Sequence, residues 1–246
     1  MRFSSSASRI TRDEACGGAL AQQTPDGSGV IAERSRVGSA KLVLRLPEPM
    51  LARSGPIPGG RGWVFEPKLD GFRCFVCTHA VFRARSRRGW DMTHLLPEFR
   101  KSVPEGVQLD GELVALAEDG RPDFHRLSSR MLHGRTGATL TLFVFDVLAI
   151  EGLSTTMQPY SERRALLEQL DLENEWVRLV ATFEDGEALF AAVCERVLEG
   201  VVANRERDPY RPGERQWVKT KNRTTVRFAE EREGVGRRAT RAPGRA

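Results

Sequence analysis

Short runs rich in β-branched and aromatic residues, bounded by glycine, proline or aspartate, limit what this chain can fold into more than any other feature. They occupy residues 63–65, 72–78, 107–116, 140–150, 177–182, 201–204 and 216–219. Runs of this kind predict strands. Because helical patterns come only irregularly between them, the sequence predicts an α+β domain built on antiparallel sheets instead of a regular βαβ winding.

Two segments between these runs have helical periodicity, residues 161–170 and 186–198. In the second segment, apolar side chains recur at spacings of three and four from Leu189 to Leu198, so they form one stripe on a helix. Core packing is the simplest explanation of this stripe. Gly200 stands where a helix of this length is expected to end.

The chain has 246 residues, of which 40% are hydrophobic and 29% are charged, and this composition is typical of a soluble globular protein. No apolar run approaches the roughly 20 residues that a membrane helix needs. The first eight residues are not followed by the apolar core of a signal peptide. Composition therefore excludes a disordered, fibrous or membrane-embedded chain, and we expect a cytoplasmic protein.

We expect three parts along the chain: a disordered leader over residues 1–40, a folded domain over residues 41–221 and a basic C-terminal tail over residues 222–246. The leader is rich in serine, glycine and alanine and has no periodicity. The tail carries seven arginines against three acidic residues. It could bind a polyanion such as nucleic acid, and a solvated, disordered tail is an equally good interpretation.

The four cysteines, Cys16, Cys74, Cys77 and Cys194, are too few and too scattered for a disulfide framework, so we expect reduced thiols. Cys74 and Cys77 have CxxC spacing and lie near His79. However, no second pair of ligands follows, and residues three apart on a strand face opposite sides of the sheet. A zinc or redox site is therefore not predicted here.

Residues 63–73, WVFEPKLDGFR, are the most informative stretch for function. In extended geometry Glu66 and Lys68 project from one face, while Phe65 and Leu69 project from the other and root the strand in the core. A lysine is a nucleophile only when it is neutral, so partial burial and neighbouring cations would have to lower the pKa of Lys68. Taken alone, this residue would more often be a surface lysine with its ammonium group in solvent.

A second pair of lysines, Lys219 and Lys221, lies in the run WVKTK and shares one face of a predicted strand. Only five of the 38 basic side chains are lysines, so a lysine in this composition indicates a position that needs a compact point charge. Two ammonium groups that converge on Lys68 would lower its pKa and would also neutralise the phosphates that it attacks.

Two carboxylates and one aromatic residue complete the candidate site. Glu112 lies in the run DGE of a predicted strand, and Glu199 lies between the second helical segment and the next strand. Without a histidine cluster, two carboxylates suit a hard cation such as Mg²⁺, although each of them alone is more often a solvated turn residue. Phe145 is a candidate stacking platform, although an aromatic residue on a strand usually belongs to the core.

Taken in order, these motifs resemble those of the ATP-dependent DNA ligase nucleotidyltransferase superfamily. The matching runs are KLDGFR from Lys68, SRRG from Ser86, DGE from Asp110, FD from Phe145, EGVV from Glu199 and WVKTK from Trp217. The sequence is most similar to the ligase modules of bacterial end-joining enzymes and to their small stand-alone relatives. Residues 49–52, 122–124 and 160–164 also fit that subgroup, and the likeness spans about residues 46–221.

The resemblance implies the ATP-grasp-like catalytic fold that DNA ligases share with mRNA capping enzymes. It also implies that Lys68 attacks the α-phosphate of ATP and forms a lysyl-adenylate. The other nucleotide-binding residues that it implies are Glu66 at the adenine, Phe145 stacked on the base, Arg73 and Glu112 at the ribose, Lys219 and Lys221 at the α-phosphate, and Arg87 at the nucleic-acid or ribose side. Glu112 and Glu199 would place Mg²⁺ or Mn²⁺. The AMP would then pass to a 5′-phosphate at a DNA nick or end, where a 3′-hydroxyl displaces it.

Two features depart from the family pattern. Many relatives have a basic residue five positions after the glutamate, where this chain has Asn204, so an arginine such as Arg205 would have to supply that phosphate contact. Relatives also usually append an OB-fold, and the 25 residues that follow Lys221 are too few for one. We therefore expect an OB-fold or end-joining partner in another chain, or a partial substitution by the basic tail.

Two other functions remain open at this point. One is a nucleotide-binding or nick-binding accessory protein that has lost turnover, and the presence of Lys68, Glu112, Glu199, Lys219 and Lys221 argues against it. The other is an RNA ligase or a capping-type guanylyltransferase, which shares the covalent lysine. The flanking segments that are similar to end-joining ligases make this second alternative the weaker of the two.

Overall fold

The structure of the protein is a computed structural model that describes residues 45–134 and 137–225. All of these residues belong to one compact unit, Ala40–Ala246. The expected leader and all but four residues of the expected tail lie outside the described residues. None of the described helices is long and apolar enough to cross a membrane.

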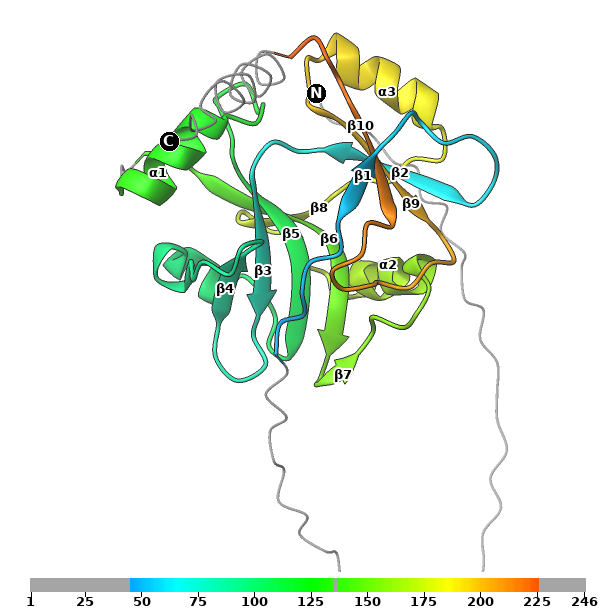
Figure 1. The fold of residues 1–246 in the computed structure, drawn as a ribbon. Helices are drawn as coiled ribbons and strands as arrows, with labels where there is room; N and C mark the ends of the chain where they lie inside the picture. The colour runs from blue at the N-terminus through cyan, green and yellow to red at the C-terminus, as the bar shows by residue number, and fades with distance from the viewer. Residues whose placement is uncertain (1–44, 135–136, 226–246) are drawn as a thin grey trace, which may run out of the picture. The chain divides into compact units, whose positions relative to one another are not determined.

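One sheet has six strands, in the order β4-β3-β5-β6-β7, with β8 paired to β6 off that path. Pairing is antiparallel throughout, except that β8 runs parallel to β6. The strands are β3 (Phe72–Cys77), β4 (Arg83–Ser86), β5 (Val107–Ala115), β6 (Leu140–Ile150), β7 (Leu153–Ser154) and β8 (Val177–Leu179). The two long strands β5 and β6 form its centre (Figure 1).

The second sheet has four strands, in the order β1-β10-β9-β2. These are β1 (Ala52–Ser54), β2 (Trp63–Lys68), β9 (Gly200–Arg205) and β10 (Trp217–Lys221). The first and last segments of the described chain meet here, because β1 pairs in parallel with β10. In this sheet Gly200 is in register with Lys68 on one side and with Lys221 on the other, so the two lysines flank a position that has no side chain.

In the described part of the chain, three α-helices and two short 3₁₀ helices pack on these sheets. They are η1 (Thr93–Leu95), η2 (Pro97–Lys101), α1 (Phe124–His133), α2 (Tyr160–Gln169) and α3 (Gly186–Glu195). Asp123 and Asp185 cap the N-termini of α1 and α3, each accepting a backbone N–H three residues later at 2.9 Å. In Figure 1, α3 lies along β2 and β9, where Leu189 and Val193 pack against Phe65.

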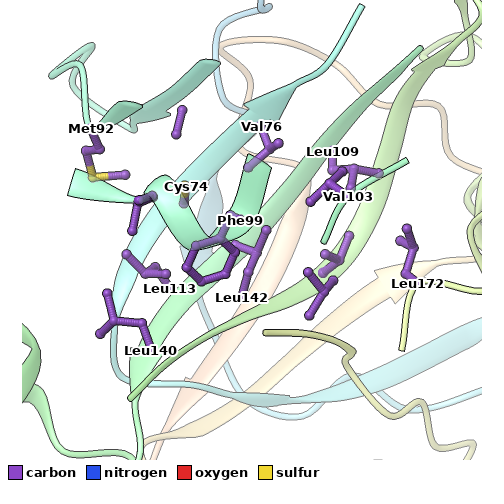
Figure 2. Close-up of a cluster of buried hydrophobic side chains, with 14 of the residues drawn as sticks. Cys74, Val76, Met92, Phe99, Val103, Leu109, Leu113, Leu140, Leu142 and Leu172 are labelled. Atoms are coloured by element: carbon purple, nitrogen blue, oxygen red, sulfur yellow. The ribbon is translucent and has the colours of Figure 1, made fainter. Parts of the chain in front are cut away.

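The largest hydrophobic cluster lies on the six-stranded sheet. Its centre is Phe99 of η2, whose ring lies among Cys74, Leu113 and Leu142 (Figure 2). A separate cluster joins the two sheets, with Phe75 and Leu148 from the six-stranded sheet and Trp217 from the four-stranded sheet, together with Met50 and Tyr210. The two sheets therefore share packed residues, and the candidate site lies where they meet.

The predicted α+β class and antiparallel sheets are confirmed, and the differences are local. The helix α1, both 3₁₀ helices and the strands β1, β4 and β7 were not predicted. The third helix ends at Glu195 instead of residue 198. Val197 takes a left-handed conformation with φ 58° just after it, whereas Gly200 is the first residue of β9.

Candidate active site

A cavity of about 1130 Å³ opens between the two sheets, and every residue singled out from the sequence as a site residue lines it. These residues are Glu66, Lys68, Arg73, Arg87, Glu112, Phe145, Glu199, Lys219 and Lys221. Side chains on one face of β2, β9 and β10 form one side of the cavity, and side chains from β3, β5 and β6 form the other. The topology thus brings together residues that are far apart in the sequence.

Lys68 is the last residue of β2, and its Nζ lies 2.7 Å from Oε2 of Glu199. The Nζ of Lys221 lies 3.9 Å from the other oxygen of the same carboxylate. The Lys68 side chain is 22% exposed and that of Glu199 is 10% exposed, so this ion pair is partly shielded from solvent. Burial lowers the pKa of Lys219, and the neighbouring ammonium groups of Lys68 and Lys221 lower it further. Three cations facing one carboxylate leave an excess of positive charge, which favours an anion such as phosphate.

Glu112 lies on β5, in register with Arg73 on β3. Burial raises its pKa to about 7, against the attraction of Lys68 and Arg73, and the negative charge of Glu199 adds to the rise. Within residues 45–134 and 137–225, no group of three or more histidine, cysteine, aspartate or glutamate side chains could hold a metal ion. Two carboxylates that line one cavity nevertheless fit Mg²⁺, which keeps several waters and completes its shell with substrate phosphates.

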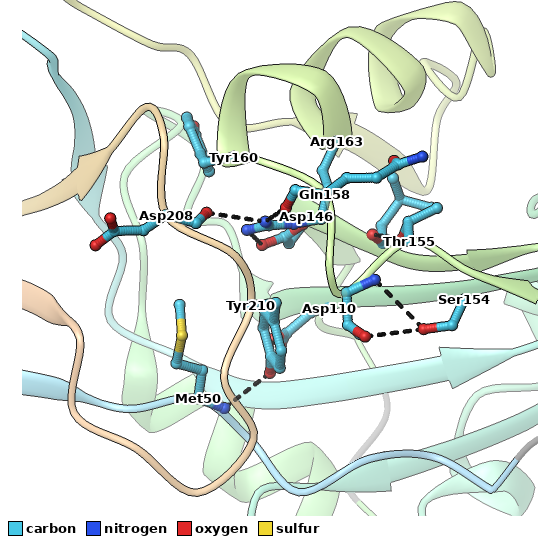
Figure 3. A network of polar contacts seen from close by, with 12 residues as sticks. Met50, Asp110, Asp146, Ser154, Thr155, Gln158, Tyr160, Arg163, Asp208 and Tyr210 are labelled. Carbon is cyan, nitrogen blue, oxygen red and sulfur yellow. Dashed lines mark hydrogen bonds and ion pairs between the residues drawn. The ribbon is translucent and has the colours of Figure 1, made fainter.

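Arg73 is fixed by two groups that were not assigned a role from the sequence. Its Nε donates to Oδ1 of Asp110 at 2.7 Å, and its Nη2 donates to Oδ2 of the same residue. The hydroxyl of Tyr210 donates to Asp110 at 2.8 Å and accepts from the backbone N–H of Met50 at 2.8 Å (Figure 3). Asp110 could have been found, because it begins the run DGE, whereas Tyr210 lies in the loop between β9 and β10 and gave no local signal.

Phe145 lines the cavity and also packs against the core. Its ring meets that of Trp217 edge-on, with centroids 5.7 Å apart. The guanidinium carbon of Arg73 lies 5.0 Å from the centroid of Phe145 and 4.8 Å from that of Trp217. Phe145 is therefore both a boundary of the core and an aromatic surface of the cavity, and Arg73 is held by aromatic rings as well as by Asp110.

Glu66, the one carboxylate of β2, is 5% exposed, and its Oε1 accepts a hydrogen bond from the hydroxyl of Tyr160 at 2.6 Å. Burial raises the pKa of Glu66 to about 7, while Tyr160 and Asn204 oppose that rise. Arg205, weighed above as a replacement for a basic residue at Asn204, lies with its guanidinium carbon 4.2 Å from the ring centroid of Trp63. It is not among the residues that line the cavity.

Comparisons with known proteins identify the family of this chain. Residues 49–221 match the family described as the ATP dependent DNA ligase domain. The chain is 36% identical over 186 residues to the multifunctional non-homologous end joining DNA repair protein LigD of Mycobacterium tuberculosis, covering 72% of this chain and 24% of LigD. It is 30% identical over 180 residues to the SPbeta prophage-derived DNA ligase-like protein LigB of Bacillus subtilis, covering 71% of this chain and 67% of LigB.

Among solved structures, a mycobacterial DNA ligase D in complex with ATP and MES superposes with a TM-score of 0.62 at 34% sequence identity. The match covers 72% of this chain and 60% of that structure. The present chain spans about a quarter of the length of LigD. The structural match confirms the expected nucleotidyltransferase fold, and the family model covers most of the described residues. The chain belongs to the ATP-dependent DNA ligase domain family.

Proposed function

We propose that this domain performs the adenylation chemistry of an ATP-dependent DNA ligase, with Lys68 as the nucleophile. Nζ of Lys68 attacks the α-phosphorus of ATP, a phosphoramidate bond forms, and the bond to the β-phosphate breaks, so that pyrophosphate leaves. The observation that carries this proposal is the contact of 2.7 Å between Lys68 and Glu199 inside a cavity that two further lysines line.

The carboxylate of Glu199 is the base nearest the nucleophile among the described residues. Lysine attacks only as the neutral amine, so a proton must leave Nζ before or during attack. Oε2 of Glu199 already accepts a hydrogen bond from Nζ and is placed to take that proton. Lys221, on the other oxygen of this carboxylate, keeps the side chain oriented toward the cavity.

Lys219 and Lys221 are proposed to bind the α-phosphate. Burial, followed by the ammonium groups of Lys68 and Lys221, lowers the pKa of Lys219 in the free protein. A bound phosphate supplies the missing negative charge, so it is attracted most where these cations are crowded. The same positive charges stabilise the negative charge that develops on the phosphate oxygens during attack.

Glu112 and Glu199 are proposed to hold Mg²⁺ or Mn²⁺, since carboxylate oxygens suit both ions. When bound, the ion would neutralise charge on the phosphates of ATP. Glu112 lies beside Arg73 on neighbouring strands, so the residues proposed for the metal and for the ribose are adjacent. Glu66 and Phe145 complete the proposed nucleotide site at the base.

The proposed acceptor of the AMP is a 5′-phosphate at a DNA nick or end, from which a 3′-hydroxyl then displaces AMP. Three exposed arginines line the cavity beside the nucleotide residues, Arg87, Arg88 and Arg215. Guanidinium groups bind phosphates well, so this edge of the cavity suits a nucleic-acid backbone. The similarity to LigD favours DNA ends over RNA as the substrate. The few scattered cysteines favour a cytoplasmic location.

The acceptor is tested by mixing the purified, adenylated chain with a nicked duplex that carries a 5′-phosphate. We expect labelled AMP to move from the protein to the DNA strand, and we expect none to move to a matched duplex with a 5′-hydroxyl. An RNA duplex with the same nick distinguishes the RNA ligase alternative. Transfer to RNA in preference to DNA, or no transfer from an adenylated chain, would contradict the proposed substrate.

A further inference from the structure

The first turn of α2 makes two buried polar contacts that the proposed chemistry does not use. Tyr160, the first residue of α2, donates to Glu66 at 2.6 Å. One turn later, Arg163 donates through Nε and Nη2 to the two oxygens of Asp146, both at 2.8 Å (Figure 3). Arg163 is fully buried and Asp146 is 1% exposed. Leaving either partner of such a pair alone would cost several kcal/mol, so these contacts fix α2 firmly.

The residues that this turn contacts are linked to the proposed base site. Glu66 itself lines the cavity from β2, and Asp146 directly follows Phe145 on β6. Helix α2 therefore links Glu66, proposed to contact the edge of the base, with the strand that carries Phe145, proposed to stack on it. No other described helix has hydrogen bonds of its side chains to residues in both β2 and β6.

Tyr160 controls how the carboxylate of Glu66 can be used. Burial and the adjacent Glu66 raise the pKa of Tyr160 well above its ordinary value, so the phenol remains a donor. Because it occupies Oε1, the remaining oxygen of Glu66 is the one available to a ligand in the cavity. Above its pKa of about 7, a carboxylate held in this way accepts hydrogen bonds and repels a carbonyl oxygen.

Asn204 lies on β9, beside this carboxylate. It is in register with Val64, two residues before Glu66 on the same face of β2. Although Asn204 is 2% exposed, neither its Nδ2 nor its Oδ1 has a hydrogen-bond partner among the described residues. Asn204 does not line the cavity, but its amide lowers the pKa of the neighbouring Glu66 carboxylate, so its effect on a bound base passes through Glu66. Asn204 is neutral, whereas Arg164 of α2 contributes positive charge that acts on the Glu66 carboxylate.

We propose that Tyr160 and Asn204 are positioning residues that act through Glu66 to make the cavity select adenine over a 6-oxopurine. This inference rests on the proposed nucleotide site. Adenine carries a donor amine at C6, whereas hypoxanthine carries an acceptor oxygen there. A buried site built to accept a hydrogen bond rejects a ligand that lacks the donor, because its own polar group is then left unpaired.

The test is equilibrium binding of ATP and ITP to the full chain, with divalent metal chelated so that no covalent step follows. We expect the wild-type chain to prefer ATP about 100-fold or more. Tyr160→Phe should reduce this preference at least about 10-fold, because Oε1 of Glu66 loses its donor. Tyr210→Phe removes the hydroxyl of the only other tyrosine, at the Arg73 side of the cavity, and should weaken both nucleotides equally.

Asn204→Leu gives a second test, and it should be well folded because it removes an unpaired buried amide. We expect it to lower the preference for ATP several-fold. An unchanged ratio of ATP to ITP affinity in folded Tyr160→Phe and Asn204→Leu would overturn the inference, as would an equal loss in Tyr210→Phe. Adenylation is scored separately, so a chain that selects ATP but never becomes labelled contradicts the proposed chemistry and not the base selection.

Discussion

Lys68 and Glu199 are 131 positions apart in the sequence, yet Nζ and Oε2 lie 2.7 Å from each other. The register of β2 against β9 produces this contact, because Lys68 is opposite Gly200, the residue that follows Glu199. Strand pairing therefore places the nucleophile and its nearest base in contact.

Glu199→Gln should reduce the rate of lysyl-adenylate formation by about 10²–10⁴-fold, because the amide cannot take the proton from Nζ. The substitution is nearly isosteric, so the hydrogen bond to Lys68 can persist and the fold should remain. Single-turnover labelling with α-labelled ATP measures the rate, and circular dichroism checks the fold. A variant that labels as fast as the wild type would show that Glu199 is not the base.

Gly200→Ala should disrupt the site, because a Cβ at this position would lie 2.2 Å from the backbone oxygen of Thr220. Strands β9 and β10 would have to separate at Gly200, the position of β9 that Lys68 of β2 and Lys221 of β10 flank. We expect a fall in thermal stability and a loss of labelling. Gly59→Ala is the matched control, since nothing lies within 4 Å of its added Cβ, and it should leave both measurements unchanged.

Asp110→Asn should lower the free energy of unfolding by about 3–5 kcal/mol, because it removes the charge that compensates the largely buried Arg73. Denaturant unfolding measures this change. The control is Asp119→Asn, which breaks the exposed pair of Asp119 with Arg121 and should leave the free energy of unfolding nearly unchanged. Equal effects of the two substitutions would mean that the buried pair does not stabilise the domain.

The pKa of Glu66, raised by burial to about 7 from an ordinary 4.5, predicts how stability depends on pH. The folded protein holds this proton more tightly than the unfolded chain, so the contribution is fully present below about pH 4.5 and is lost as the pH rises toward 7. Its size is on the order of 3 kcal/mol. Relative to Glu66→Gln, the wild-type chain should lose stability over this interval and then level off. Parallel pH profiles for the two chains would contradict the assigned pKa.

Local patterns in the sequence were enough to place Glu66, Lys68 and Lys219 at one site, whereas Arg87 was named only through the family resemblance. Glu66 and Lys68 alternate with Phe65 along β2, and Lys219 alternates with Val218 along β10, so the face of each side chain follows from strand geometry alone. The expectation that Leu69 faces away from Lys68 was wrong, because β2 ends at Lys68 and Leu69 lines the cavity as well.

Other features depend on contacts between distant segments and could not be predicted. The hydrogen bond between Tyr210 and Asp110 joins residues 100 positions apart, and neither residue has a local pattern that points to the other. The strand β7 has only two residues and exists through its pairing with β6. The end of α3 was misplaced because Val197 takes a left-handed conformation that usually favours glycine.

The most direct test of the account is covalent labelling of the purified chain with α-labelled ATP and Mg²⁺, beside Lys68→Ala and Lys101→Ala, in samples shown by mass to carry no AMP. Lys101 is exposed on η2, away from the cavity. We predict a labelled protein band for the wild type and for Lys101→Ala, and no band for Lys68→Ala. A band that persists in Lys68→Ala, or a wild-type chain that never becomes labelled, would contradict the assignment of Lys68 as the nucleophile that receives AMP.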